Sequence, residues 1–164
     1  MPKTYEPIAT QTVGTAVATV TFSSIPQTYT DLMLVAVYDL VSGGGSMNVR
    51  FNSDSSGNYG FTYLFGNGSV AASGRTANAT GVAAGRAASG GQGGGHTYIF
   101  NYSNTTTYKS ALSRSYGLIA SASPWFSANT WRNTNAITSI TCSDESSGNF
   151  AVGATLTLYG IKAA

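Results

Sequence analysis

The chain has 164 residues, a formal net charge of +2 and 9% charged residues, against roughly 25% in ordinary soluble domains. Hydrophobic residues make up 42%, which excludes an intrinsically disordered chain, and no apolar run reaches the roughly 18 residues that a membrane-spanning helix needs. The eight lysines and arginines are scattered singly, which excludes a local basic patch for nucleic acid. We therefore expect one domain over residues 1–164 that binds neither nucleic acid nor membrane.

The low charge also predicts a surface that tolerates contact with other proteins. Ser, Thr, Asn and Gly must supply most of the exposed side chains. These uncharged groups can be buried against a neighbour at modest cost, whereas each charge costs several kcal/mol when it is dehydrated. The composition therefore suits a subunit of a packed assembly.

The first strands are predicted by the alternation of apolar and polar side chains. Ala18, Val20 and Phe22 alternate with threonines, which is typical of a strand with one buried face. Residues 32–40 are apolar on both faces, so we expect a central strand that is covered on both sides or lies at a subunit contact.

A hairpin is predicted over residues 47–65. Met47, Val49 and Phe51 alternate with polar residues, and a second alternating run follows at residues 59–65. The residues between the two runs are Asn-, Asp- and Ser-rich, and we expect Gly57 to adopt a positive φ there.

Further strands are expected at residues 97–102, 109–118, 136–142 and 149–159, which brings the number to about eight or nine. Helical periodicity is nearly absent from the chain. Many short strands joined by Gly- and Asn-rich turns predict an all-β fold, specifically an antiparallel β-sandwich that is jelly-roll-like.

Residues 66–95 interrupt this pattern, because Gly, Ala and Ser dominate and only Val70 and Val82 are bulky and apolar. Such a stretch cannot build a core, and a long loop of this kind is usually functional or mobile. We expect a long Gly/Ala/Ser-rich loop that neighbouring subunits order. It carries Arg75 and Arg86, which we count among the candidate contact residues.

No set of residues predicts catalysis or metal binding. His96 is the only histidine and is interpreted as a polar residue between loop and strand, while Cys142, the only cysteine, is interpreted as an unactivated strand residue. Asp144 and Glu145 are expected in a solvated turn, and the loop around Asp54 lacks the further acidic ligands of a calcium site. We therefore expect no enzymatic activity, no cofactor and no metal.

The aromatic residues Trp125, Phe126 and Trp131 lie in a segment that we expect to be a connection between strands. They could cap the sandwich, anchor a subunit contact or form a platform for carbohydrate. All three are candidate residues for contact with a subunit or a ligand.

Four segments carry a resemblance to known proteins: Tyr5-Glu-Pro-Ile-Ala-Thr-Gln-Thr-Val13, Val20-Thr-Phe-Ser-Ser-Ile-Pro-Gln-Thr-Tyr-Thr-Asp-Leu32, Val49-Arg-Phe-Asn-Ser-Asp-Ser-Ser-Gly-Asn-Tyr59 and Gly153-Ala-Thr-Leu-Thr-Leu-Tyr-Gly-Ile-Lys162. They resemble small bacteriophage virion proteins of the tail-fibre and capsid-surface kind. The first two segments are similar to the family's first hairpin and central strand. The resemblance implies a jelly-roll-like virion component, commonly a homotrimer, without enzymatic activity.

Among virion components, we expect a capsid decoration or cement protein, because the sandwich fills the chain and leaves no room for a trimeric fibre shaft. Its partners would be further copies of itself and other virion proteins such as the major capsid protein. A tail-fibre or spike component, or a tip that binds a receptor or a host glycan, stays the alternative. No signal peptide opens the chain at Met1, so we expect synthesis in the host cytoplasm and a final location on the particle surface.

Overall fold

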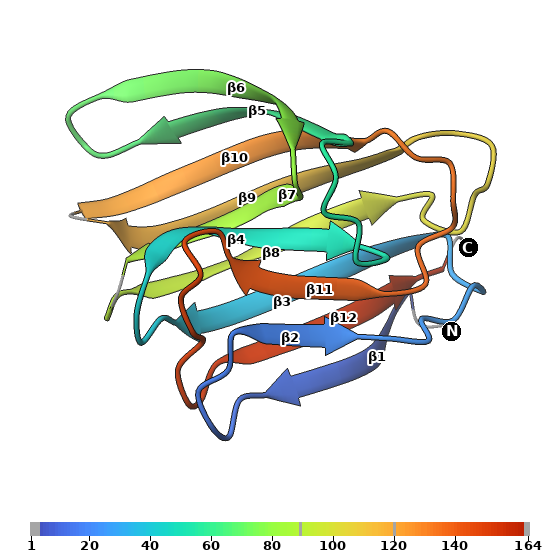
Figure 1. Cartoon of the computed structure of the whole chain (residues 1–164), viewed down its shortest axis with the longest axis horizontal. Helices are drawn as coiled ribbons and strands as arrows, with labels where there is room; N and C mark the ends of the chain where they lie inside the picture. Colours follow the sequence, from blue (N-terminus) through green and yellow to red (C-terminus); the bar gives the residue numbers. More distant parts are fainter. Residues whose placement is uncertain (1–3, 89, 120, 163–164) are drawn as a thin grey trace.

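A computed structural model describes residues 4–88, 90–119 and 121–162. In this part of the chain twelve strands form two antiparallel sheets that pack face to face (Figure 1). In order across the large sheet the strands are β1 (Tyr5–Thr12), β12 (Thr155–Ile161), β3 (Asp31–Asp39), β8 (Gln92–Phe100), β9 (Lys109–Ile119), β10 (Ser121–Trp131), β5 (Tyr59–Gly66) and β6 (Ala71–Ala79). Those of the small sheet are β2 (Thr19–Phe22), β11 (Ile140–Asp144), β4 (Gly44–Phe51) and β7 (Val82–Ala88).

The predicted all-β fold and antiparallel β-sandwich are confirmed, while the jelly-roll-like connectivity stays a prediction. The described residues contain three more strands than the upper end of the expected number, in part because residues 66–95 contribute strands of their own. A search of the described residues for a helix long and apolar enough to cross a membrane finds none.

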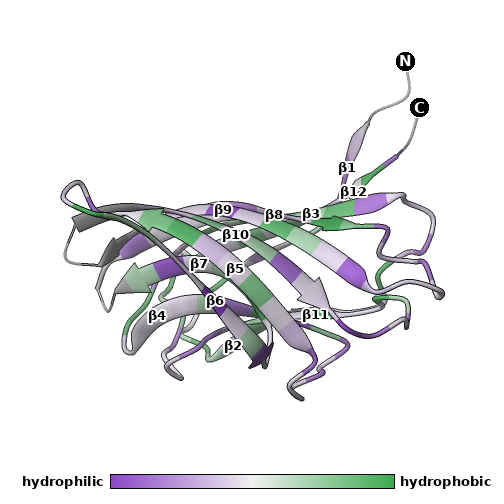
Figure 2. Ribbon diagram, turned by 90° about the horizontal axis from the view of Figure 1, so that it is seen from above, coloured by the Kyte–Doolittle hydropathy of each residue, from purple (hydrophilic) through white to green (hydrophobic). Residues whose placement is uncertain are grey.

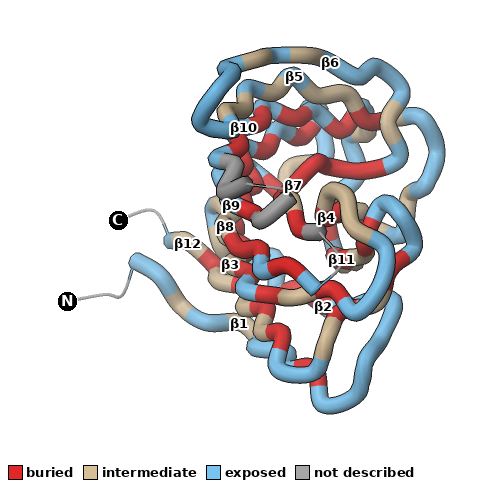
Figure 3. Tube along the Cα trace, turned by 90° about the vertical axis from the view of Figure 1, so that its left-hand side faces the viewer, coloured by how far each residue is buried: buried red, intermediate tan, exposed pale blue. Residues whose placement is uncertain are grey.

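The core lies between the two sheets, as the buried segments in Figure 3 show. In β3 the side chains of Leu32, Leu34 and Ala36 point into this core, whereas Val37 is 58% exposed. Among the described residues nothing covers the side of β3 that carries Val37, so of the two alternatives for this strand the subunit contact stays a prediction. One face of the large sheet packs on the small sheet, and we call the opposite one the outer face.

The predicted hairpin of residues 47–65 is wrong, because β4 belongs to the small sheet and β5 to the large sheet. The chain crosses between the sheets at Asn52 and Ser53, which have φ of 53° and 58°, and Gly57 has no such angle. Asn tolerates this conformation, and the Asn52 side chain accepts hydrogen bonds from the backbone N–H groups of Thr138 (2.8 Å) and Ser139 (3.2 Å). The crossing is thereby tied to the segment that leads into β11.

The prediction of a long loop over residues 66–95 is also wrong, since they form β6, β7 and the start of β8. Small residues are needed because these strands pass very close to their neighbours. A Cβ added at Gly117 in β9 would lie 1.7 Å from the carbonyl oxygen of Arg86, and one added at Gly93 would lie 2.6 Å from the same atom. The glycines therefore let the backbone of β7 lie directly on β8 and β9.

The free edge of β7 is held by polar side chains of β10. The Ser127 hydroxyl donates to the carbonyl of Ala83 (2.7 Å), and the Ala83 N–H donates to Oδ1 of Asn129 (3.1 Å). These bonds satisfy two buried polar side chains and occupy the edge of the small sheet. Strands β5 and β6 lie beyond β10 in the large sheet and so extend past this edge.

Candidate interaction surfaces

Trp131 lies in β10 rather than in a connection, and it is buried. Its ring packs edge-on to Phe51 (centroids 5.6 Å apart) and stacks with Tyr59 (6.1 Å). Its Nε1 donates a hydrogen bond of 2.8 Å to the carboxylate of Asp54. Among the three interpretations of this tryptophan, the structure therefore supports the one in which it caps the sandwich.

Trp125 and Arg86 are brought together beneath the extension of the large sheet. The Trp125 ring stacks on Tyr63 with centroids 4.3 Å apart, and the guanidinium carbon of Arg86 lies 4.8 Å from the indole centroid. Trp125 is 4% exposed. Neither tryptophan presents an open ring face, so the interpretation of the pair as an exposed carbohydrate platform is wrong.

Phe126 points the opposite way, onto the outer face, where it is about half exposed. It pairs across β10 and β5 with Leu64, and on the same face Leu112 of β9 pairs with Tyr98 of β8. We call Leu64, Tyr98, Leu112 and Phe126 the outer-face cluster. Figure 2 shows hydrophobic segments on these neighbouring strands of the large sheet.

The outer-face cluster lines a hollow of about 540 Å³. The hydroxyl groups of Tyr5 in β1 and Tyr98 in β8 lie 3.1 Å apart although two strands separate β1 from β8, which indicates that the outer face is concave. Among the described residues that line the hollow, only Arg114 carries a full charge, and its guanidinium lies 6.0 Å from the Phe126 ring. The hollow is therefore a mainly apolar surface.

Of the sequence candidates, only Phe126 belongs to the outer-face cluster. Arg75 is exposed on the edge strand β6, where it pairs with Thr62, a residue that lines the hollow. The sequence analysis missed Leu112 and Leu64. The signal was present in the alternation of β9, where Leu112 stands between two small residues that face the core.

Of the residues considered for catalysis, His96 lies in the large sheet, apart from Cys142 and Asp144 in the small sheet. His96 is inside β8 on the outer face, with its ring edge-on to Tyr98 at 5.6 Å, and not at a border between loop and strand as expected. Cys142 lies in β11, as predicted, and burial raises the pKa of its thiol to about 12. A thiol with that pKa is a weak nucleophile at neutral pH.

Asp144 is buried, so its prediction as part of a solvated turn is wrong. Its Oδ2 accepts hydrogen bonds from the backbone N–H groups of Gly148 (2.9 Å) and Gly44 (3.3 Å). The carboxylate therefore joins the start of β4 to the connection that follows β11. Glu145, the next residue, is exposed as expected.

The carboxylate of Asp54 already accepts hydrogen bonds from other groups of the protein. It accepts hydrogen bonds from Ser56, Asn58 and Trp131. Partial burial raises the pKa of Asp54, but these hydrogen bonds outweigh it and lower the pKa well below its usual value. In the described part of the chain no three His, Cys, Asp or Glu side chains gather as metal ligands would.

Comparison of the chain with protein-family models, with curated protein sequences and with solved structures found no match.

Proposed function

We propose that the protein is a non-enzymatic structural subunit of a bacteriophage particle, a capsid decoration or cement protein that acts as a homotrimer. The observation that carries this proposal is the outer-face cluster, a group of large apolar side chains left uncovered on neighbouring strands. Contiguous apolar surface of this kind is typical of contacts between proteins. The outer-face cluster forms the contact between subunits.

The energetics favour association through this face. Full burial of a Leu or Phe side chain contributes about 1.5–3 kcal/mol, so covering the exposed halves of Leu64, Leu112 and Phe126 contributes about 1 kcal/mol each. Arg114 is the one full charge that such a contact must accommodate within the hollow. Because Arg114 is exposed, its charge can stay in water at the rim of the contact, which avoids a dehydration cost of several kcal/mol.

The assignment to a phage particle, its trimeric state and the jelly-roll-like module are supported by the resemblance of the terminal and central segments to virion surface proteins. The low charge of the chain supports the same assignment, because subunits of a packed shell bury much of their surface. Closed threefold symmetry would also strengthen attachment to a shell, since each bound subunit raises the effective concentration of the others.

The absence of enzymatic activity is supported by the placement of the reactive groups. Cys142 lies between the sheets, His96 lies on the outer face, and the Asp144 carboxylate is held by the backbone N–H groups of Gly44 and Gly148. A nucleophile and its base must be within hydrogen-bond reach of one another, and His96 lies in β8 of the large sheet, whereas Cys142 and Asp144 lie in β11 of the small sheet.

Co-sedimentation with phage particles tests the proposal. Particles are purified from a phage in which the gene for this chain is disrupted, mixed with the purified protein and centrifuged. We expect saturable binding, and immunogold labelling confined to the capsid. Protein that stays in the supernatant, or labelling confined to the tail, would contradict a capsid decoration protein.

A further inference from the structure

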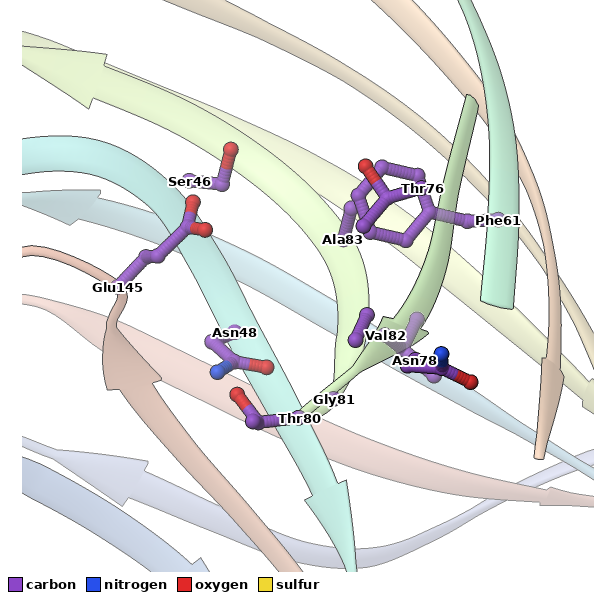
Figure 4. Close-up of a pocket in the computed structure, with 11 residues that line it drawn as sticks. Ser46, Asn48, Phe61, Thr76, Asn78, Thr80, Gly81, Val82, Ala83 and Glu145 are labelled. Carbon is purple, nitrogen blue, oxygen red and sulfur yellow. The ribbon is translucent and has the colours of Figure 1, made fainter. Parts of the chain in front are cut away.

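A second hollow, of about 230 Å³, lies where β5 and β6 extend past the edge of the small sheet (Figure 4). One wall carries Phe61 and Thr76, which are direct partners across β5 and β6. The other carries Ser46 and Asn48 of β4 together with Glu145, and the turn that joins β6 to β7 closes one side. Strands β4, β5, β6 and β7 and the turn between β6 and β7 therefore border one small space.

Asn48 is the most informative residue of this hollow. It is 7% exposed, and its side chain lines the hollow with Oδ1 beside Gly81. A Cβ at Gly81 would lie 1.7 Å from Oδ1 of Asn48, so only a glycine there leaves room for the amide. Since the amide opens into the hollow, it can form hydrogen bonds there with water or with a ligand that replaces the water.

The other groups lining the hollow define the chemistry of that partner. Ser46, Thr76 and Thr80 add hydroxyl groups that can both donate and accept, and Glu145 adds an acceptor. Figure 4 shows Ser46 and Glu145 on one side of the space and Phe61 on the other. Amide, hydroxyl and carboxylate groups facing one aromatic ring suit a molecule with several hydroxyl groups and an apolar face.

We propose that this hollow binds a single neutral sugar residue of a glycan. Asn48, with its neighbours Ser46 and Thr80, bonds the sugar hydroxyls, Glu145 accepts from a hydroxyl at the mouth, and Phe61 packs against the C–H face of the ring. The volume of about 230 Å³ corresponds to about eight water molecules at roughly 30 Å³ each, which suits one sugar ring. The described lining includes no lysine or arginine to hold a phosphate or a carboxylate.

A cationic ligand fits less well, because Glu145 is exposed and its charge is screened by water. The hollow is also independent of the proposed subunit contact. Phe61 points to the inner side of β5, whereas its neighbours Thr62 and Leu64 point to the outer face. A trimer joined through the outer-face cluster would leave the sugar-binding hollow open.

Saturation-transfer NMR tests the proposal on the full chain. The probes are the methyl glycosides of glucose, galactose, mannose and N-acetylglucosamine, each at millimolar concentration, with adenosine and spermidine as non-sugar probes. We expect transfer to at least one glycoside and at least about a tenfold loss of affinity in Asn48→Ala. Thr76→Val, on the exposed strand β6, is also expected to weaken binding. It provides a second test of the hollow if Asn48→Ala does not fold.

Thr62→Ala is the matched control, since Thr62 lies on β5 beside Phe61 but faces the outer side. It should bind the same glycoside as wild type does, and circular dichroism should show the same fold in every variant compared. Absence of transfer to all four glycosides would overturn the proposal, as would binding unchanged in folded Asn48→Ala and Thr76→Val. Transfer to adenosine or spermidine alone would overturn it as well.

Discussion

Single polar side chains hold the connections of this sandwich in place. Asn52 bonds the segment before β11, Asp144 joins the start of β4 to the connection after β11, and Asp54 fixes the loop that follows β4. Asp54 also reaches the core, because it accepts the indole N–H of Trp131. Trp131 and Gly148 are buried, so Asp54 and Asp144 satisfy donors that would otherwise be buried without a partner.

Replacing Asp54 with Ala is expected to lower the free energy of unfolding by about 2 kcal/mol at pH 7, because it leaves the Trp131 N–H unpaired. Since the pKa of Asp54 is lowered in the folded state, its contribution is present above the usual value of about 3.9 and is lost as the pH falls below it. The difference between wild type and variant should therefore shrink from pH 7 to pH 3. Urea unfolding at both pH values measures it.

Ser55→Ala, at an exposed position of the same loop, should change the stability by less than about 0.5 kcal/mol and serves as the control. An Asp54→Ala variant as stable as this control at pH 7 would show that the carboxylate does not hold the loop.

At this scale the sequence predicted some residues and not others. Cys142 was predicted as an unactivated strand residue because the alternation around it is regular. Trp125 and Trp131 were placed in a connection because β10 contains Pro124 and has polar residues facing inwards. Ser127 and Asn129 face inwards since they bond the edge of β7, and this partner cannot be seen in the local pattern.

At the scale of elements, β6 and β7 could not be predicted because their residues are small rather than alternately apolar and polar. The structure gives the reason, which is that β7 lies directly on glycines of β8 and β9. The partners of β4 were also missed, since they are β11 and β7 instead of the next strand along the chain. Pairing between strands distant in sequence depends on the whole core and is not contained in a local turn.

Gly117→Ala is expected to lower the free energy of unfolding by about 3 kcal/mol, because its Cβ would collide with the Arg86 backbone and force β7 away from β9. Gly14→Ala is the control, since no atom lies within 4 Å of its added Cβ, and it should leave the stability nearly unchanged. Denaturant unfolding compares the two variants with wild type. Equal stability of the two variants would contradict the close packing of β7 on β9.

For the whole molecule, the fold class followed from the spacing of short alternating runs, and the two packed sheets confirm it. The uncovered outer face did not follow, because alternation along a strand does not tell what, if anything, covers each of its two faces. In the described part of the chain two sheets pack together, so no further layer covers the outer face of the large sheet. The outer-face cluster lies on this sheet, which is why we assign it to contact between subunits.

Light scattering during gel filtration tests this assignment most directly. We expect wild type to have three times the chain mass of 16.9 kDa, and Leu112→Lys to have the mass of a single chain, because a lysine in the hollow would bring a second positive charge beside Arg114. Val152→Lys, at another exposed apolar position outside the hollow, should stay trimeric. A wild-type protein with the mass of one chain, or a Leu112→Lys variant that remains a trimer, would contradict the account.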